Sequence, residues 1–184
     1  MKIALIGYGR MGKTIERFAK DRGHTIVYIN NDGSLNVEQA KLADVAIEFT
    51  QPDAAADNIT DLLTAGVPVV SVTTGWLEAK NKVDQIASSQ AVGFVYASNF
   101  SLGVNLFFAF NEKLASMMNE YKDYQPRIHE IHHTGKKDEP SGTAITAAEG
   151  ILKAYPALDG WTMDSESKGL TISAERMDPY FGTH

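Results

Sequence analysis

Short apolar runs alternate with longer mixed segments along residues 1–100. The apolar runs cover residues 2–6, 24–30, 44–49, 66–71 and 91–96. Runs of roughly four to eight apolar residues that end at turn-forming residues are typical of buried strands. Their alternation with helical segments predicts a parallel sheet joined by right-handed crossovers. We therefore expect an α/β fold that opens with a Rossmann-type parallel sheet.

The pattern changes beyond residue 100. The expected elements there are a helix at 102–119, a strand at 127–133, a helix at 141–154 and a strand at 170–174. Polar segments separate these elements, and neither an internal repeat nor a low-complexity tract occurs. We expect a first domain over residues 1–120 and a smaller α+β domain over residues 121–184.

Three glycines follow the first expected strand at the spacing of a dinucleotide-binding turn. Gly7, Gly9 and Gly12 lie between that strand and a segment with helical spacing of its apolar residues. The first glycine of such a turn permits a tight bend, the second lets the backbone approach a pyrophosphate, and the third lets helix and strand pack closely. We predict a nucleotide site here, with Arg10 placed to reach a phosphate. The alternative is that these glycines only punctuate a turn.

The carboxyl ends of the later strands are small, polar or aromatic. They are Phe49 and Thr50, Thr73 to Gly75, and Ala97 to Phe100. Ligands of parallel sheets bind beyond these ends, so we expect a nicotinamide cleft there. After the second strand, Asp32 either bonds a ribose hydroxyl or completes an Asp-Gly turn. The cofactor is expected to be NADH or NADPH, with NADH slightly favoured because no arginine pair follows for a 2′-phosphate.

Composition narrows the classes of partner. The chain has 184 residues, a formal net charge of −6 and no cysteine. The acidic balance argues against a nucleic-acid partner, and the missing cysteines exclude disulfides and thiolate chemistry. No apolar run approaches the roughly 20 residues of a membrane helix, and the apolar N-terminus lacks the length of a signal peptide. We expect a cytoplasmic protein that does not interact with membranes.

Residues 130–144 hold the densest group of reactive side chains. His132, His133 and Lys136 precede Ser141, Gly142 and Thr143, which are expected to form the first turn of a helix. The start of a helix presents unpaired N–H groups and a partial positive charge, which together suit an anion. Lysine and histidine beside it can hold a carboxylate and move a proton. The stretch predicts acid–base chemistry on a small anionic substrate.

A metal site in this stretch is disfavoured. Glu130, His132, His133 and Asp138 offer ligand atoms, but adjacent histidines in a strand point to opposite faces and no histidine pair lies four apart on a helix. For the same reason His132 and His133 can converge only where the strand ends. The isolated histidines are expected to be structural or solvent-exposed; they are His24, His129 and His184.

Five motifs occur in a fixed order along the chain. They are Gly7-Tyr-Gly-Arg-Met-Gly12, Glu48-Phe-Thr50, Thr73-Thr-Gly75, Ser98-Asn-Phe-Ser-Leu-Gly-Val-Asn105, and Glu130-Ile-His-His133 followed by Asp138-Glu-Pro-Ser-Gly-Thr143. Together they closely resemble the 4-hydroxy-tetrahydrodipicolinate reductase family over essentially the whole chain. The last motif is the most specific. The resemblance implies a dinucleotide-binding domain, then a domain for substrate binding and oligomerisation, in a homotetramer.

The resemblance also implies a reaction and residue roles. The family reduces the dehydrated form of 4-hydroxy-tetrahydrodipicolinate, a small dicarboxylate, with NADH or NADPH on the diaminopimelate route to lysine. His132 matches the acid–base residue and Lys136 the proton donor. The positions matching substrate-carboxylate contacts are His133, Ser141, Gly142, Thr143 and Thr74. The positions matching the cofactor lining are Gly7, Arg10, Met11, Phe49, Thr50, Thr73, Gly75, Ala97 and Phe100.

Two departures from the family pattern keep alternatives open. Val72 stands where a glycine is expected, so its side chain could crowd the cofactor. The chain stops at His184, whereas family members continue, so we expect the second domain to be incomplete. A truncated, non-catalytic nucleotide-binding module is therefore one alternative. A related dehydrogenase of an amino acid such as aspartate is another, although residues 130–144 argue against it.

Overall fold

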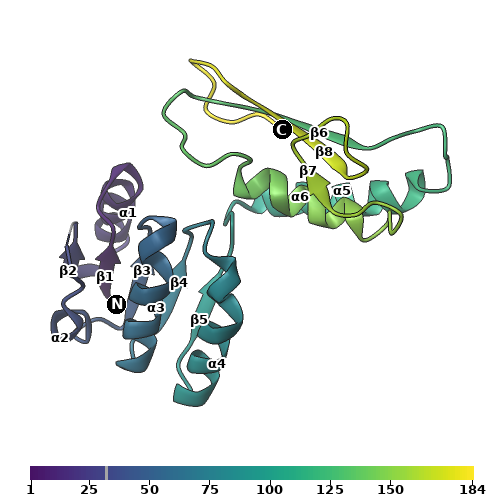
Figure 1. The fold of residues 1–184 in the computed structure, drawn as a ribbon. Helices are drawn as coiled ribbons and strands as arrows, with labels where there is room; N and C mark the ends of the chain where they lie inside the picture. Colours follow the sequence, from purple (N-terminus) through teal and green to yellow (C-terminus); the bar gives the residue numbers. More distant parts are fainter. Residues whose placement is uncertain (32) are drawn as a thin grey trace. The chain divides into compact units, whose positions relative to one another are not determined.

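The computed structural model describes residues 1–31 and 33–184. The chain forms two compact units, Met1–Ala97 and Ser98–His184, and each is described by itself (Figure 1). The division falls before the boundary expected at residue 120. Helix α5 (Leu102–Met118) accounts for the difference, because it packs against helix α6 (Gly142–Leu152) of the second unit.

Within the described residues, the first unit holds a five-stranded parallel sheet in the order β2-β1-β3-β4-β5, which confirms the expected α/β class. The strands are β1 (Lys2–Ile6), β2 (Thr25–Asn30), β3 (Val45–Glu48), β4 (Val69–Ser71) and β5 (Phe94–Tyr96). The connecting helices are α1 (Arg10–Asp21), α2 (Val37–Ala40), α3 (Pro52–Thr64) and α4 (Lys80–Gln90), with a 3₁₀ turn, η1, at Leu77–Ala79.

Both faces of this sheet are covered around β1. Ile3 and Leu5 share a buried cluster with Ala19 of α1. Ala4 and Ile6 belong to a second cluster, with residues of α3 and α4. Successive strand residues point to opposite faces, so a strand covered on both sides needs apolar residues at every position. This explains why residues 3–6 of β1 form an unbroken apolar run.

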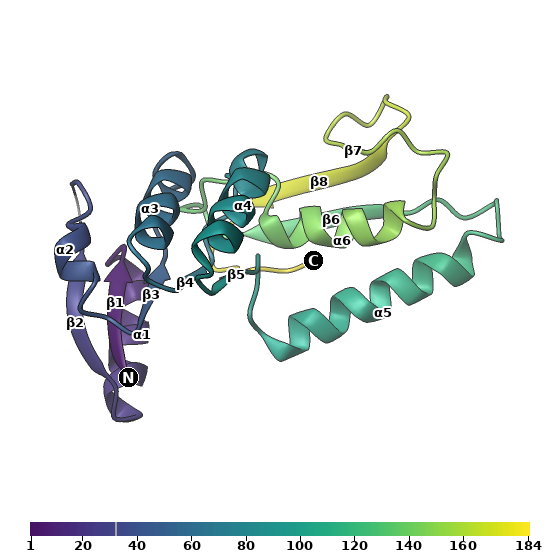
Figure 2. The ribbon, with the colours of Figure 1, turned by 90° about the horizontal axis from the view of Figure 1, so that it is seen from below.

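The second unit combines a small sheet with two helices. Its strands are β6 (Arg127–His132), β7 (Trp161–Thr162) and β8 (Leu170–Arg176), which pair in parallel in the order β6-β8-β7. Helix α6 packs on this sheet through alanines and Ile151, and α5 runs beside α6 (Figure 2). Strand β7 lies in a segment expected to be irregular; two residues are too few for a pattern to reveal a strand.

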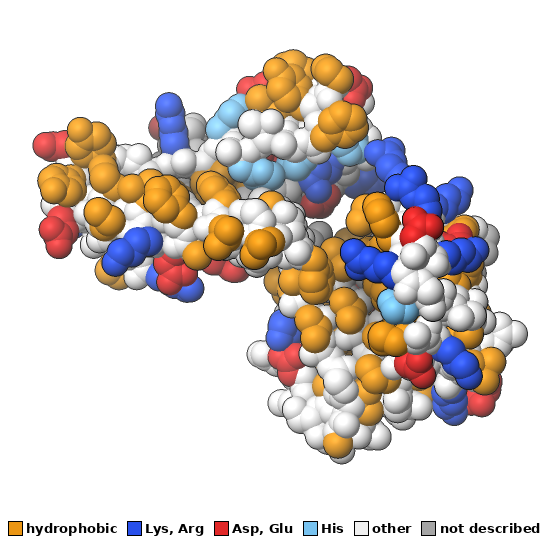
Figure 3. Space-filling model, turned by 180° about the vertical axis from the view of Figure 1, so that it is seen from behind, with side chains coloured by type: hydrophobic (Ala, Val, Ile, Leu, Met, Phe, Trp, Pro, Cys, Tyr) orange, Lys and Arg blue, Asp and Glu red, His pale blue; other side chains and the backbone are white. Residues whose placement is uncertain are grey.

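One face of α5 carries exposed apolar side chains. Leu102, Leu106, Phe110 and Leu114 recur at intervals of four and are 44% to 76% exposed. Residues at this spacing lie on one side of a helix, and hydrophobic side chains gather along α5 in Figure 3. An exposed apolar stripe of this kind is typical of an interaction surface. No helix in the described part of the chain, α5 included, is long and apolar enough to cross a membrane.

Candidate active site

The glycine turn after β1 has three different local environments. Gly7 has a φ of +96°, and a Cβ built on it would lie 2.3 Å from the carbonyl oxygen of Phe49. A Cβ on Gly12 would lie 2.5 Å from the carbonyl oxygen of Gly7. Nothing lies within 4 Å of a Cβ on Gly9. The tight bend and the close helix–strand packing are therefore present, and Gly9 leaves open space in front of the backbone.

This turn lies where the strand order reverses. Strand β1 is paired with β2 on one side and β3 on the other, so the connections leave β1 in opposite directions. The backbone N–H of Gly7 donates to the carbonyl oxygen of Asn30 at 2.8 Å and ties the turn to the end of β2. Crevices of this kind hold nucleotides in doubly wound folds. Asp32, expected beside the ribose, lies outside the described residues.

A buried carboxylate connects the ends of β3 and β4. Glu48 is 0% exposed and accepts hydrogen bonds from the backbone N–H of Thr50 at 2.7 Å, the hydroxyl of Ser71 at 2.7 Å and the hydroxyl of Thr73 at 2.9 Å. The Thr50 hydroxyl donates to the same carboxylate. Two residues expected to line the cofactor, Thr50 and Thr73, are therefore held by one acid. The sequence pattern did not single out Glu48 for this role.

The remaining positions expected on the nucleotide side differ in their surroundings. Arg10 begins α1 and is exposed, as is Met11, whereas Phe49 and Ala97 are half-buried. Gly75 has a φ of +81°, and a Cβ on it would lie 3.2 Å from the side chain of Pro52. Within the described residues, no polar side-chain contact defines a role for Thr74, which is half-buried in the first unit, or for Phe100, which is half exposed in the second.

In the second unit, β6 presents a buried acid and a buried histidine on one face. Ile128, Glu130 and His132 alternate with more exposed residues, and Glu130 is 0% and His132 7% exposed. His133 follows the end of the strand, and its Nδ1 accepts a hydrogen bond from the N–H of Gly135 at 3.1 Å. The two adjacent histidines therefore occupy different environments, as alternation along a strand requires.

Glu130 is the centre of a polar cluster. The backbone N–H of Ser141 donates to both carboxylate oxygens at 3.1 and 3.2 Å, and the Arg176 guanidinium lies 3.3 Å from Oε1. The Nε2 atoms of His132 and His184 each lie 3.4 Å from Oε2. Burial acts to raise the pKa of Glu130, but the Ser141 hydrogen bonds and the charges of His132 and Arg176 outweigh it and leave that pKa below its usual value.

His184 takes part in this cluster although it was expected to be structural or exposed. Its Nε2 lies 3.0 Å from the hydroxyl of Ser141, and its ring meets that of His132 edge-on, with centroids 5.1 Å apart. Burial is the main cause that lowers the pKa of His184, and the charge of Glu130 opposes it. Arg176 likewise carried no sequence signal for the site, because its contact with Glu130 joins positions far apart in the chain.

Lys136 and Asp138 form a separate ion pair beside this cluster. The Lys136 ammonium lies 2.7 and 2.9 Å from the two carboxylate oxygens of Asp138. Burial raises the pKa of Asp138, yet the hydrogen bond and charge of Lys136 more than offset this and lower it. Arg176 also donates to the carbonyl oxygen of Asp138 at 2.7 Å, so the loop that carries Lys136 is tied to β8.

The start of α6 keeps open donors, as predicted. Ser141 caps the helix: its hydroxyl accepts from the N–H of Ala144 at 3.1 Å. The N–H groups of Gly142 and Thr143 have no hydrogen bond within the described residues, as is usual for the first turn of a helix. They and the dipole of α6 can receive a carboxylate.

Glu130, His132 and His184 also form the arrangement most suited to a cation. One ligand atom from each lies within 4.8 Å of the others, and two imidazoles with a carboxylate can bind zinc. However, both oxygens of Glu130 already accept from Ser141, and the Arg176 guanidinium lies beside one of them. That positive charge opposes a bound cation, so the arrangement fits a hydrogen-bonded network better.

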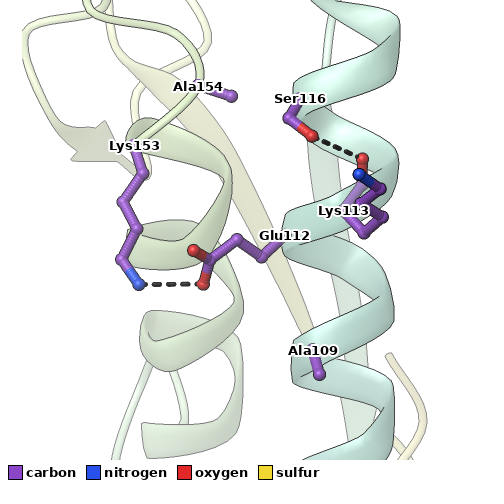
Figure 4. Close-up of a pocket in the computed structure, with 6 residues that line it drawn as sticks. All are labelled: Ala109, Glu112, Lys113, Ser116, Lys153 and Ala154. Atoms are coloured by element: carbon purple, nitrogen blue, oxygen red, sulfur yellow. Dashed lines mark hydrogen bonds and ion pairs between the residues drawn. The ribbon is translucent and has the colours of Figure 1, made fainter.

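A separate groove lies between α5 and α6, with a volume of about 570 Å³. Lys153 and Glu112 form an ion pair of 2.8 Å across it, and the other lining residues are Ala109, Lys113, Ser116 and Ala154 (Figure 4). None of the predicted site residues lines this groove. Among the described residues, the lining of this groove contains neither a histidine nor the open N-terminus of a helix, the features that would mark an active site.

Comparison with known proteins agrees with these observations. The family model described as "Dihydrodipicolinate reductase, N-terminus" matches residues 1–100, and that described as "Dihydrodipicolinate reductase, C-terminus" matches residues 103–184. A 4-hydroxy-tetrahydrodipicolinate reductase from Christiangramia forsetii is 48% identical over 186 residues, which cover 100% of this chain and 78% of the relative.

Solved structures with the same fold include a dihydrodipicolinate reductase from Paenisporosarcina sp. TG-14 with bound dipicolinate. It has a TM-score of 0.67 and 24% identity, and the match covers 99% of this chain and 80% of that one. An NAD-binding protein from Listeria innocua has a TM-score of 0.53 and 14% identity, over 85% of this chain and 53% of that one.

The family models span nearly the whole chain, and the first matches the unit that carries the glycine turn. That unit is a pyridine-nucleotide-binding domain, and the chain is an oxidoreductase. On the strength of both matches and the identity to the Christiangramia forsetii enzyme, the chain belongs to the dihydrodipicolinate reductase family.

Proposed function

We propose that the chain reduces the dehydrated form of 4-hydroxy-tetrahydrodipicolinate to tetrahydrodipicolinate on the diaminopimelate route to lysine. The supporting observation is the cluster in which Glu130 joins His132 to Ser141 at the start of α6. It brings an acid–base side chain and open backbone donors together in one unit. That unit binds the dicarboxylate substrate, and the first unit binds NADH or NADPH.

On the nucleotide side, the turn after β1 receives the pyrophosphate. Gly9 leaves the space that a phosphate needs, and Gly7 and Gly12 give the turn its shape. Arg10 and Met11 begin the helix whose N-terminus would receive the phosphates. The positions proposed to line the rest of the cofactor are Asp32, Phe49, Thr50, Thr73, Gly75, Ala97 and Phe100. When bound, the reduced nucleotide supplies a hydride.

On the substrate side, the chain's own residues hold the carboxylates and move the proton. The open N–H groups of Gly142 and Thr143, with Ser141 and His133, bind the two carboxylates. Hydride addition to a conjugated imine leaves an electron pair that must take up a proton. Lys136 donates that proton and His132 acts as the acid–base residue. Asp138 holds the Lys136 ammonium until substrate binds.

The chain is proposed to act in the cytoplasm as a homo-oligomer. The exposed apolar stripe of α5 supports a contact between copies of the chain. Light scattering after gel filtration measures the mass directly. A mass that stays that of one copy at all concentrations would contradict this part of the proposal.

The test of the proposed function is a double variant, with one single lysine variant as its control. His132→Ala with Lys136→Ala is expected to abolish oxidation of NAD(P)H with the dehydrated intermediate, while calorimetry still detects NADH binding. Lys137→Ala is the matched control, because it removes the neighbouring ammonium and is expected to keep turnover. Full activity in the double variant would refute the proposed roles. NADH binding by the unaltered chain without any turnover would instead favour a non-catalytic module.

A further inference from the structure

The proposed roles of His132 and the start of α6 leave Glu130 without a function. This carboxylate is 0% exposed, and a buried charge is costly unless its partners balance the loss of water. Its partners come from four parts of the second unit: His132 on its own strand, Ser141 at the start of α6, Arg176 on β8 and His184 in the last segment. Among the described residues, Glu130 therefore contacts both His132 and the start of α6.

The ring of His132 lies between two oxygen atoms. Its Nδ1 lies 3.4 Å from the carbonyl oxygen of Phe181, and its Nε2 lies 3.4 Å from Oε2 of Glu130. Nε2 is buried and has no hydrogen-bond partner within the described residues, and Oε2 of Glu130 is the carboxylate oxygen that lies beside it.

The charged side chains around the ring pair with one another. Glu130 lies beside Arg176, and Asp138 pairs with Lys136. The His184 ring lies 5.1 Å from that of His132. Burial, together with the charges of His132 and Lys136, lowers the pKa of His184 against the opposing charge of Glu130.

We propose that Glu130 is a positioning residue for the reduction. Its Oε2 lies against Nε2 of His132 and both of its oxygens hold the N–H of Ser141, so that one carboxylate sets the spacing between the acid–base ring and the carboxylate-binding turn. Neutral His184, held between Ser141 and Glu130, closes the cluster on the other side. This inference rests on the proposed function of His132.

The decisive variant is Glu130→Gln, which keeps the shape of the side chain and an acceptor for Ser141 but removes the charge. We expect kcat to fall roughly 10- to 100-fold with little change in KM. The split between kcat and KM is the readout, because a general loss of structure would change both.

The chain provides a matched control in Glu175→Gln. Glu175 also lies beside a histidine, with Oε1 3.6 Å from Nε2 of His129, but both side chains are about half exposed. This variant should leave kcat and KM unchanged. A Glu130→Gln enzyme with the kcat of the unaltered chain would overturn the inference.

Other variants separate the inference from the proposed function. If His132→Gln keeps turnover, the proposed function of His132 fails; if it loses turnover while Glu130→Gln behaves normally, only the present inference fails. Should Glu130→Gln not fold, Glu130→Asp keeps the charge one methylene further away and should lower kcat with little change in KM; an unchanged kcat would refute positioning. Activity lost to a chelator and restored by Zn²⁺ would make the cluster a metal centre and overturn the inference.

Discussion

Replacing Gly7 by alanine is predicted to destabilise the first unit and to weaken nucleotide binding. The new Cβ would lie 2.3 Å from the carbonyl oxygen and 2.7 Å from the carbonyl carbon of Phe49. These are backbone atoms and cannot rotate away as a side chain could. The backbone of Gly7 also has a φ of +96°, which alanine rarely adopts.

The magnitude follows from these two effects. A left-handed backbone costs a residue with a Cβ about 1 to 2 kcal/mol, and forcing a methyl group into a packed site costs roughly 1 to 3 kcal/mol. We expect Gly7→Ala to lose about 2 to 5 kcal/mol of unfolding free energy. For a chain of this size, each 1 kcal/mol corresponds to a fall in Tm of about 2 to 4 °C.

Two other glycines separate the contributions. Gly23 has a φ of +76° but open space around its Cβ, so Gly23→Ala should lose only the backbone term. Gly9 has a φ of −77° and open space, so Gly9→Ala should keep its stability while its methyl group weakens NADH binding. Urea unfolding and calorimetric titration with NADH measure both quantities for all three variants. If Gly7→Ala were as stable as Gly23→Ala, the reasoning from the Phe49 contact would be refuted.

Three further predictions concern the polar clusters. Ser141→Ala removes the cap of α6 and should cost about 1 kcal/mol of unfolding free energy; a thermal melt with no change would contradict it. Glu48→Leu leaves the donors of Thr50, Ser71 and Thr73 without their buried acceptor and should cost about 3 kcal/mol in urea unfolding; equal midpoints would exclude this role for Glu48. The pKa of His184 lies below its ordinary 6.5, so its neutral form stabilises the fold above that pH and the contribution is lost as the pH falls through the lowered pKa. His184→Gln should flatten this part of the stability–pH curve. An unaltered slope would rule out His184 as the group responsible for the pH dependence.

The chemistry of the candidate site was partly predictable because it is local in sequence. The glycine turn, the cap at Ser141 and the divergence of His132 from His133 depend on neighbouring residues. The grouping of Glu130 with Arg176 and His184 was not predictable, because it depends on the pairing of β6 with β8 and on where the last segment returns. For the same reason the boundary between the two units was expected too late: helical periodicity predicts α5, but its contact with α6 decides the unit to which it belongs.

Sequence by itself determined the class of fold, because an unbroken apolar run such as β1 requires cover on both faces, and glycines at positions 7 and 12 allow close contacts that no side chain permits. It also determined which reactive side chains are available, since His132, Lys136 and the start of α6 lie within one short stretch. Only the tertiary structure decided which of these groups meet a buried charge. A carboxylate acts over a few ångströms in space, and the partners of Glu48 and Glu130 come together only when strands far apart in the chain lie side by side.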